Sequence, residues 1–277
     1  MIGAARNDDA GAARQVELLQ IATLFGQAPL QVMATAIVVP AVWLVMRTAA
    51  DPLVVTVWAA AQLGASALLI LLWRLHALAT SEAQRLKFGR AYVGGSLLYG
   101  LALGLGCFAM FVPGRVDYQM FLAAILGTMC GTASGTHSVY RPVCIAFIGS
   151  ALLPFAARLY LDGGELQLLL AIVAVAAMGA FLFAVVHFSR RLAVGFRLQI
   201  ENARLAAEMR ATQERLNLAL ESIADAFVTF DSSDRLVLAN RKYRDMLLLA
   251  GLDIGEGEHS YADVIGAIVK SGPITAT

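Results

Sequence analysis

The sequence predicts a mainly α-helical protein, with a bundle of six transmembrane helices, then a cytoplasmic coiled-coil helix, then a small α+β segment. The first observation is composition: 59% of the 277 residues are hydrophobic and 15% are charged, whereas ordinary soluble domains carry roughly 25% charged residues. The second is distribution, because residues 28–187 are almost free of charge and residues 188–245 are rich in it. Two regions in different solvents are therefore expected.

Residues 1–27 are expected to form a cytoplasmic N-terminal segment. The stretch contains Asp8 and Asp9 and leads into no short apolar core with a cleavage site, so it does not resemble a secretory signal peptide. Residues 14–27 have the pattern of an amphipathic helix that lies on the membrane surface. Its apolar residues are Val16, Leu19, Ile21, Leu24 and Phe25.

Six apolar stretches then make up a transmembrane domain over residues 28–187. Each is near the ~20 residues that a helix needs to cross the hydrocarbon core. They are residues 28–46, 52–73, 91–112, 118–137, 142–160 and 166–187. The fourth is the least apolar, because it is rich in Gly, Thr and Ser, and only a tight hairpin separates it from the fifth.

The basic residues set the expected orientation. With the N-terminus inside, ten Arg and Lys residues face the cytoplasm and three face outside, which satisfies the rule that cytoplasmic loops carry the excess of positive charge. Six crossings then return the C-terminus to the cytoplasm. The formal net charge is +1 and there is no long run of Lys or Arg, so a nucleic-acid partner is not expected.

Small residues in the spans predict close helix packing. Gly100 and Gly104 are four residues apart, as are Gly127, Gly131 and Gly135, and such rows let helix backbones approach each other. An unwound helix that lines a transport path is the alternative for these glycines. No Asp, Glu or Lys lies near the middle of a span, which disfavours a pump or an ion-coupled transporter.

Three histidines fall near span ends that the topology places on the cytoplasmic side, namely His76, His137 and His187. Imidazoles at one level can bind haem iron or a metal ion. They form no pair at helical spacing, so hydrogen bonding at the interface is the simpler interpretation. His259 is expected to be an exposed residue of the tail. The three cysteines, Cys107, Cys130 and Cys144, are interpreted as small packing residues.

Residues 188–223 are expected to form a coiled-coil helix. The segment contains no Pro and a single Gly, and its residue types favour helix. One face repeats at alternating spacings of four and three, which is typical of a two-stranded coiled coil. This seam consists of Leu198, Asn202, Leu205, Met209, Thr212, Leu216, Ala219 and Ile223. Asn202 and Thr212 weaken it, and a single amphipathic helix is the alternative to a parallel homodimer.

Residues 224–277 begin with two predicted strands, 226–230 and 235–239, joined by the turn-forming sequence DSSD. Asn240 is expected to cap a helix that starts RKYRDML, because its side chain can accept a free backbone N–H. Ser260 is expected to cap a further helix with the sequence YADVIGAIVKSG.

The stretch LNLALESIADAFVTFDSSDRLVLANRKYRDMLLL is similar to the opening of a PAS domain of the subclass common in bacterial hybrid sensor kinases. The matching residues are Leu216, Ile223, Phe230, Asp231, Arg235, Leu236, Asn240, Tyr243, Gly255, Gly257, Tyr261 and Ile265. Asp234 departs from the pattern, because many relatives have Gly there. PAS domains usually run to about 100–120 residues, so the resemblance implies an incomplete domain. The stretch LLWRLHALATSEAQRLKFGRAYVGGSLLYGLALG more loosely resembles six-span sensory regions of bacterial proteins.

The resemblance implies the input module of a two-component sensor in the bacterial inner membrane, with both termini cytoplasmic. The output domain would be a histidine kinase beyond residue 277, acting on a response regulator or receiver domain. A diguanylate cyclase or phosphodiesterase output is the second interpretation, and a small-molecule carrier or channel with a regulatory tail is the third. The 277 residues contain no kinase phosphoacceptor motif or Gly-rich nucleotide site, and Asp162-Gly163-Gly164-Glu165 is interpreted as an outer loop rather than a cyclase signature. No catalytic residue is therefore assigned, and whether the tail binds haem, flavin or nothing is left open.

Overall fold

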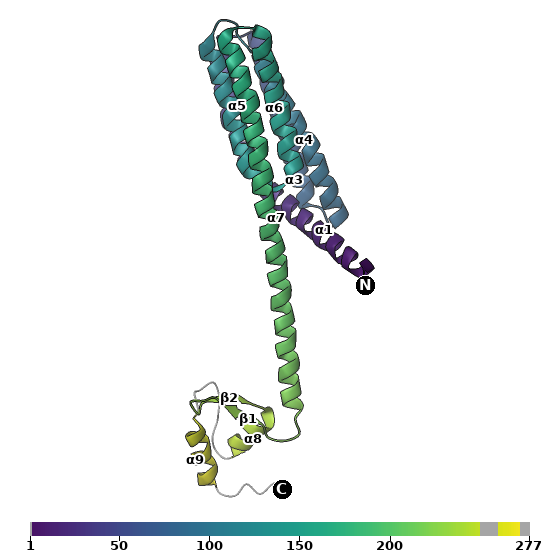
Figure 1. The fold of residues 1–277 in the computed structure, drawn as a ribbon, viewed down its shortest axis with the longest axis vertical. Helices are drawn as coiled ribbons and strands as arrows, with labels where there is room; N and C mark the ends of the chain where they lie inside the picture. Colours follow the sequence, from purple (N-terminus) through teal and green to yellow (C-terminus); the bar gives the residue numbers. More distant parts are fainter. Residues whose placement is uncertain (1, 250–259, 272–277) are drawn as a thin grey trace. The chain divides into compact units, whose positions relative to one another are not determined.

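The computed structural model describes residues 2–249 and 260–271. The protein is mainly α-helical with one small two-stranded sheet (Figure 1). It divides into two compact units, Met1–Gln199 and Ile200–Thr277, and each is described by itself below.

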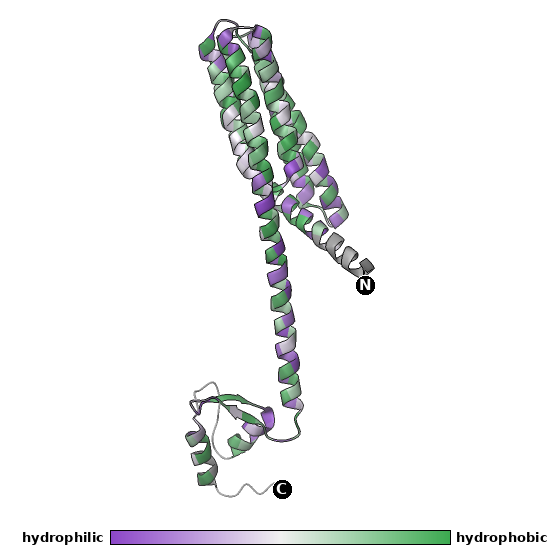
Figure 2. Cartoon of the chain, in the orientation of Figure 1, coloured by the Kyte–Doolittle hydropathy of each residue, from purple (hydrophilic) through white to green (hydrophobic). Residues whose placement is uncertain are grey.

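The first unit consists of long helices that follow the apolar stretches of the sequence. They are α1 Ile2–Gly26, α2 Ala28–Met46, α3 Pro52–Ala77, α4 Glu82–Ala109, α5 Val116–Thr136, the short 3-10 helix η1 His137–Val139, α6 Arg141–Asp162 and the start of α7 Glu165–Ser222. All six predicted apolar stretches are therefore largely helical. Figure 2 shows that hydrophobic residues dominate these helices.

Five helical segments of the described chain are long and apolar enough to cross a membrane. They are Ala13–Met46, Pro52–Ala77, Glu82–Ala109, Arg141–Asp162 and Glu165–Ser222. Helix α5 is long enough but is not among them, because Gly, Thr and Ser replace large apolar residues in its C-terminal half. The fourth predicted span, residues 118–137, is thus a helix without the hydropathy of its neighbours.

The helix ends in the first unit follow local sequence chemistry. Asp51 accepts a hydrogen bond from the backbone N–H of Leu53 at 2.9 Å and Pro52 occupies the first turn of α3, as N-terminal capping requires. Ser81 and Gln84 form a reciprocal capping box at the start of α4. Gly163 adopts a φ of +75° between α6 and α7, which a residue with a side chain rarely adopts.

Helix α4 packs closely on α6 through two glycines. A β-carbon on Gly100 would lie 2.7 Å from the carbonyl oxygen of Phe147, and one on Gly104 would lie 2.5 Å from that of Ala151. These distances confirm the close packing predicted for this row. The prediction fails for the second row, since Gly127 and Gly135 have no neighbour within 4 Å and Gly131 meets only the Phe181 ring.

Helix α1 is packed into the first unit by its apolar face. Val16, Ile21, Leu24 and Phe25 are buried inside the protein, and Leu19 is half-buried. Gly89 on α4 has no β-carbon, which leaves room for the Ile21 side chain. Much of the face that was predicted to lie on the membrane surface is thus covered by protein, and the position of α1 at that surface stays a prediction.

The second unit contains the end of α7 and a small α/β assembly. Strands β1 Val228–Phe230 and β2 Leu236–Ala239 pair antiparallel, and helices α8 Arg241–Leu249 and α9 Tyr261–Ser271 follow. Ala239, Tyr243, Leu247 and Val264 form its core. Both strands lie inside the predicted ranges. The predicted positions Gly255, Gly257 and His259 lie outside the described residues.

Candidate functional site

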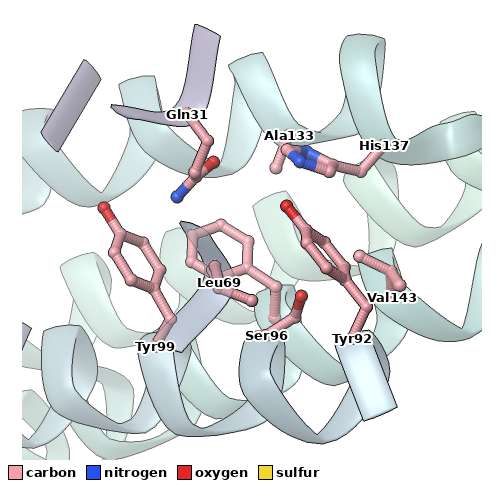
Figure 3. Close-up of a pocket in the computed structure, with 9 residues that line it drawn as sticks. Gln31, Leu69, Tyr92, Ser96, Tyr99, Ala133, His137 and Val143 are labelled. Atoms are coloured by element: carbon pink, nitrogen blue, oxygen red, sulfur yellow. The ribbon is translucent and has the colours of Figure 1, made fainter. Parts of the chain in front are cut away.

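Neutral polar side chains gather inside the first unit, where the surrounding helices are otherwise apolar. Gln31 and Thr35 come from α2, Tyr92, Ser96 and Tyr99 come from α4, and His137 comes from η1. Figure 3 shows the Tyr92 and Tyr99 rings, which lie about two turns apart on α4, with their hydroxyls directed toward Gln31 and His137. We call this group, with Gln62 of α3, the polar cluster.

The Tyr99 hydroxyl is the centre of one half of the polar cluster. It shares a hydrogen bond of 2.8 Å with the Thr35 hydroxyl, and the side chains of Gln31 and Gln62 approach the same oxygen. Neither polar atom of the Gln62 side chain has a hydrogen-bond partner of good geometry, although the residue is only 1% exposed. A buried amide without partners costs free energy. The Gln62 amide can therefore still donate hydrogen bonds to a bound molecule and accept them from it.

The Tyr92 hydroxyl is the centre of the other half. Tyr92 is 1% exposed and its hydroxyl has no hydrogen-bond partner. Its ring stacks near that of His137, with centroids 6.5 Å apart, and the His137 Nδ1 atom lies 3.0 Å from the Thr136 hydroxyl. A cavity of about 10 Å³ beside these groups is near the lower limit for one water molecule.

The chemistry of the polar cluster suits binding more than catalysis. Its cavity is lined by Gln31, Leu69, Tyr92, Ser96, Tyr99, Ala133, His137, Val143 and Phe147, with no carboxylate, ammonium or guanidinium group. The titratable side chains of this lining are His137, Tyr92 and Tyr99, and no carboxylate of the lining stands beside them as an acid–base partner. Hydrogen-bonding groups in an apolar surrounding are instead typical of sites for neutral molecules.

The three histidines considered as haem or metal ligands contact different aromatic rings. His76 stacks on Phe25 with centroids 4.0 Å apart, and Phe25 meets the edge of Tyr92, which neighbours His137. His187 stacks on Phe183 instead. Among the described residues, no group of three His, Cys, Asp or Glu side chains is placed to hold a metal ion. The structure thus links two of the histidines through aromatic rings and leaves the third apart.

The predicted coiled-coil seam runs along α7 with exposed side chains from Leu198 to Ala219, and its last residue, Ile223, lies just beyond the end of the helix at Ser222. Leu198, Leu205, Met209 and Leu216 are each at least 50% exposed, and Ile223 is half-buried. The positions between them, Asn202, Thr212 and Ala219, are exposed as well. Large apolar side chains repeated along one exposed helix face favour a partner helix.

The last turn of α7 is fixed to the α/β assembly by Asn240. This residue is 1% exposed. Its side-chain oxygen accepts hydrogen bonds from the backbone N–H groups of Phe227 and Tyr243, at 2.9 and 3.0 Å. Its amide nitrogen donates to the carbonyl of Asp225 at 2.8 Å and to that of Leu220 at 3.5 Å. The predicted cap of α8 is confirmed, and the same side chain also reaches α7.

Glu221 makes a second connection between the same elements. Its carboxylate accepts a hydrogen bond from the backbone N–H of Arg241 at 2.7 Å and an ion-pair contact from Arg244 at 2.6 Å. These two donors lower the pKa of Glu221 below its ordinary value of 4.5, and the backbone N–H of Arg241 has the larger effect. Because the folded state favours the ionised form, this stabilisation is complete above pH 4.5 and is lost as pH falls through the lowered pKa.

A pH series on Glu221→Gln tests this connection. Above about pH 5.5, the variant should show faster amide hydrogen exchange than the wild type across residues 238–247, because the charge-assisted bonds are weakened. As pH falls through the lowered pKa of Glu221, the two proteins should converge, since protonation removes the same charge from the wild type. Comparing the two at each pH cancels the intrinsic pH dependence of exchange. A difference that stays constant over the whole range would contradict the assignment.

Sequence reasoning missed the polar cluster. The spans were recognised by their lack of charge, and neutral residues such as Gln31, Gln62 and Tyr92 do not interrupt such a pattern. The available signal was the glutamines within predicted spans, Gln31 and Gln62 among them, because a buried amide needs partners that lipid cannot supply. Comparisons with protein-family models, with curated proteins and with solved structures found no match for this chain.

Proposed function

We propose that this chain is the input module of a membrane-bound bacterial sensor of the two-component type. In this proposal six helices, α2 to α7, cross the inner membrane with both termini cytoplasmic. The stimulus reaches α7, a dimer of α7 passes it on, and a PAS-like domain that begins in the α/β assembly tunes a histidine kinase beyond residue 277. The kinase would then act on a response regulator or receiver domain.

The observation that carries the proposal is the course of α7. It is one uninterrupted helix, Glu165–Ser222, that contains a candidate span at its start and the exposed seam further on. Its last turn is bonded to the α/β assembly through Asn240 and Glu221. A continuous helix tied at its end to a folded segment can transmit a small rotation or shift.

The polar cluster supports a sensor over the transport alternative. Ion-coupled carriers place charged groups such as carboxylates at membrane depth, and the lining of this cavity contains no Asp, Glu, Lys or Arg. Its hydrogen-bonding groups are instead suited to a neutral stimulus. A diguanylate cyclase or phosphodiesterase remains the alternative output, since α7 and the α/β assembly would serve either. Reading the gene beyond codon 277 separates these alternatives: a kinase phosphoacceptor motif supports the proposal, and a stop codon at 278 contradicts it.

Disulfide cross-linking in native membranes tests the dimeric seam. Leu205→Cys should give a covalent dimer on mild oxidation, because seam residues of two parallel helices face each other. Ala207→Cys, two positions along and on the opposite face of the helix, should give no covalent cross-link. The native cysteines are all buried and provide a clean background. Equal cross-linking of both variants, or none at residue 205, would contradict a seam through Leu205.

A further inference from the structure

A groove between α1 and α4 in the first unit is lined by three cationic side chains and one carboxylate. It is lined by Ala13, Arg14, Glu17, Ala83, Leu86, Lys87 and Arg90, and its volume is about 620 Å³. We call it the basic groove. The polar start of α4 forms one wall, and the apolar part of the same helix begins directly after it (Figure 2).

The walls of the basic groove are held in place by specific contacts. Arg14 on α1 lies 3.4 Å from the Glu82 carboxylate on α4. The hydroxyl of Tyr140 donates to Glu17 at 3.3 Å. Ile21 fits against Gly89, so that the two helices approach closely one turn further along. These contacts fix the shape of the groove.

The carboxylate in the lining of the basic groove, Glu17, has a partner, and so does Glu82, which precedes the lining residue Ala83. Glu82 faces Arg14, and Glu17 accepts the Tyr140 hydrogen bond. Lys87 and Arg90 form no ion pair with the residues that the structure describes. They are three positions apart on α4 and so lie on one face of the helix. This pair can hold one anionic group between them.

We propose that the basic groove binds a phosphate group, supplied by the headgroup of an anionic phospholipid. Lys and Arg are the side chains that recognise phosphate, and basic pockets between membrane helices bind anionic headgroups. The neighbouring Ala13, Ala83 and Leu86 give the groove apolar surface, which a free phosphate ion does not need and the start of a lipid acyl chain does. The inference does not depend on the sensor function.

The test measures binding of short-chain phosphatidylglycerol and phosphatidylcholine to the purified full chain in detergent. The wild type should prefer phosphatidylglycerol, and Lys87→Gln/Arg90→Gln should lower its affinity for that lipid by about 10-fold or more, from the loss of two surface cations. The matched control is Arg190→Gln/Arg191→Gln, which removes the same charge from an exposed part of α7 and should change little.

Three outcomes would overturn the inference. An equal loss in the control would show that overall charge, not this groove, attracts the lipid. Equal affinity of the wild type for both lipids would show that no anionic headgroup is selected. Inorganic phosphate that binds the wild type more tightly than phosphatidylglycerol, and loses its binding in Lys87→Gln/Arg90→Gln, would assign the site to a free phosphate. Both variants should keep the helix content of the wild type, since the replaced side chains are exposed.

Discussion

Gly104→Ala is expected to destabilise the helix bundle more than its single added methyl group suggests. A β-carbon at this position would lie 2.5 Å from the carbonyl oxygen of Ala151 and 2.6 Å from that of Ser150. Both are backbone atoms of α6 and cannot rotate away, so α4 and α6 must separate. Overpacking of this kind costs about 1–3 kcal/mol. The melting temperature of the detergent-solubilised protein should fall by about 5–10 °C.

The control for this prediction lies on the same helix. Gly94→Ala makes the identical chemical change at an exposed position with no neighbour within 4 Å. It should leave the melting temperature unchanged or raise it slightly, because Ala is the better helix former by about 1 kcal/mol. If both variants melted alike, the close approach of α4 and α6 would not be the reason that glycine is needed at 104.

The helices could be located from the sequence because hydrophobicity and turn residues act locally. Helix ends in the first unit depend on contacts within a few residues. Asp51-Pro52 begins α3, Ser81 and Gln84 begin α4, and Gly163 ends α6. Asp234 shows the same principle in the second unit. Its φ is +57°, a conformation that glycine adopts at little cost, and this is the position where the resemblance led us to expect a glycine.

Tertiary contacts could not be located in this way. The apolar face of α1 fits a membrane surface as well as it fits a protein core, and its contacts with another helix, such as Ile21 against Gly89, cannot be read from its own sequence. The glycine rows of α4 and α5 look alike in sequence, yet only the first meets a helix backbone. The polar cluster joins residues 31, 62, 92 and 137, so no local pattern could assemble it. Long-range partners decide all three cases.

Asn240→Ala is expected to open the junction between α7 and the α/β assembly. The substitution leaves two backbone N–H groups and two carbonyls without the partner that a 1% exposed side chain supplied. Losing a helix cap and leaving buried polar groups unpaired together cost about 2–4 kcal/mol. The sheet cannot compensate for this loss, because its two short strands form only three residue pairs among the described residues and such a sheet is marginally stable. Amide hydrogen exchange across residues 224–247 should therefore become much faster.

Two further variants make the Asn240 prediction specific. Asn217→Ala removes the same side chain from an exposed face of α7 and should leave exchange unchanged. Asn240→Asp keeps the oxygen that caps α8 but loses the donor to Asp225 and Leu220, so its exchange should lie between the wild type and Asn240→Ala. If α7 relays a signal, Asn240→Asp should weaken the coupling while α8 stays folded. Unchanged exchange in Asn240→Ala would show that the Glu221 connection alone holds the junction.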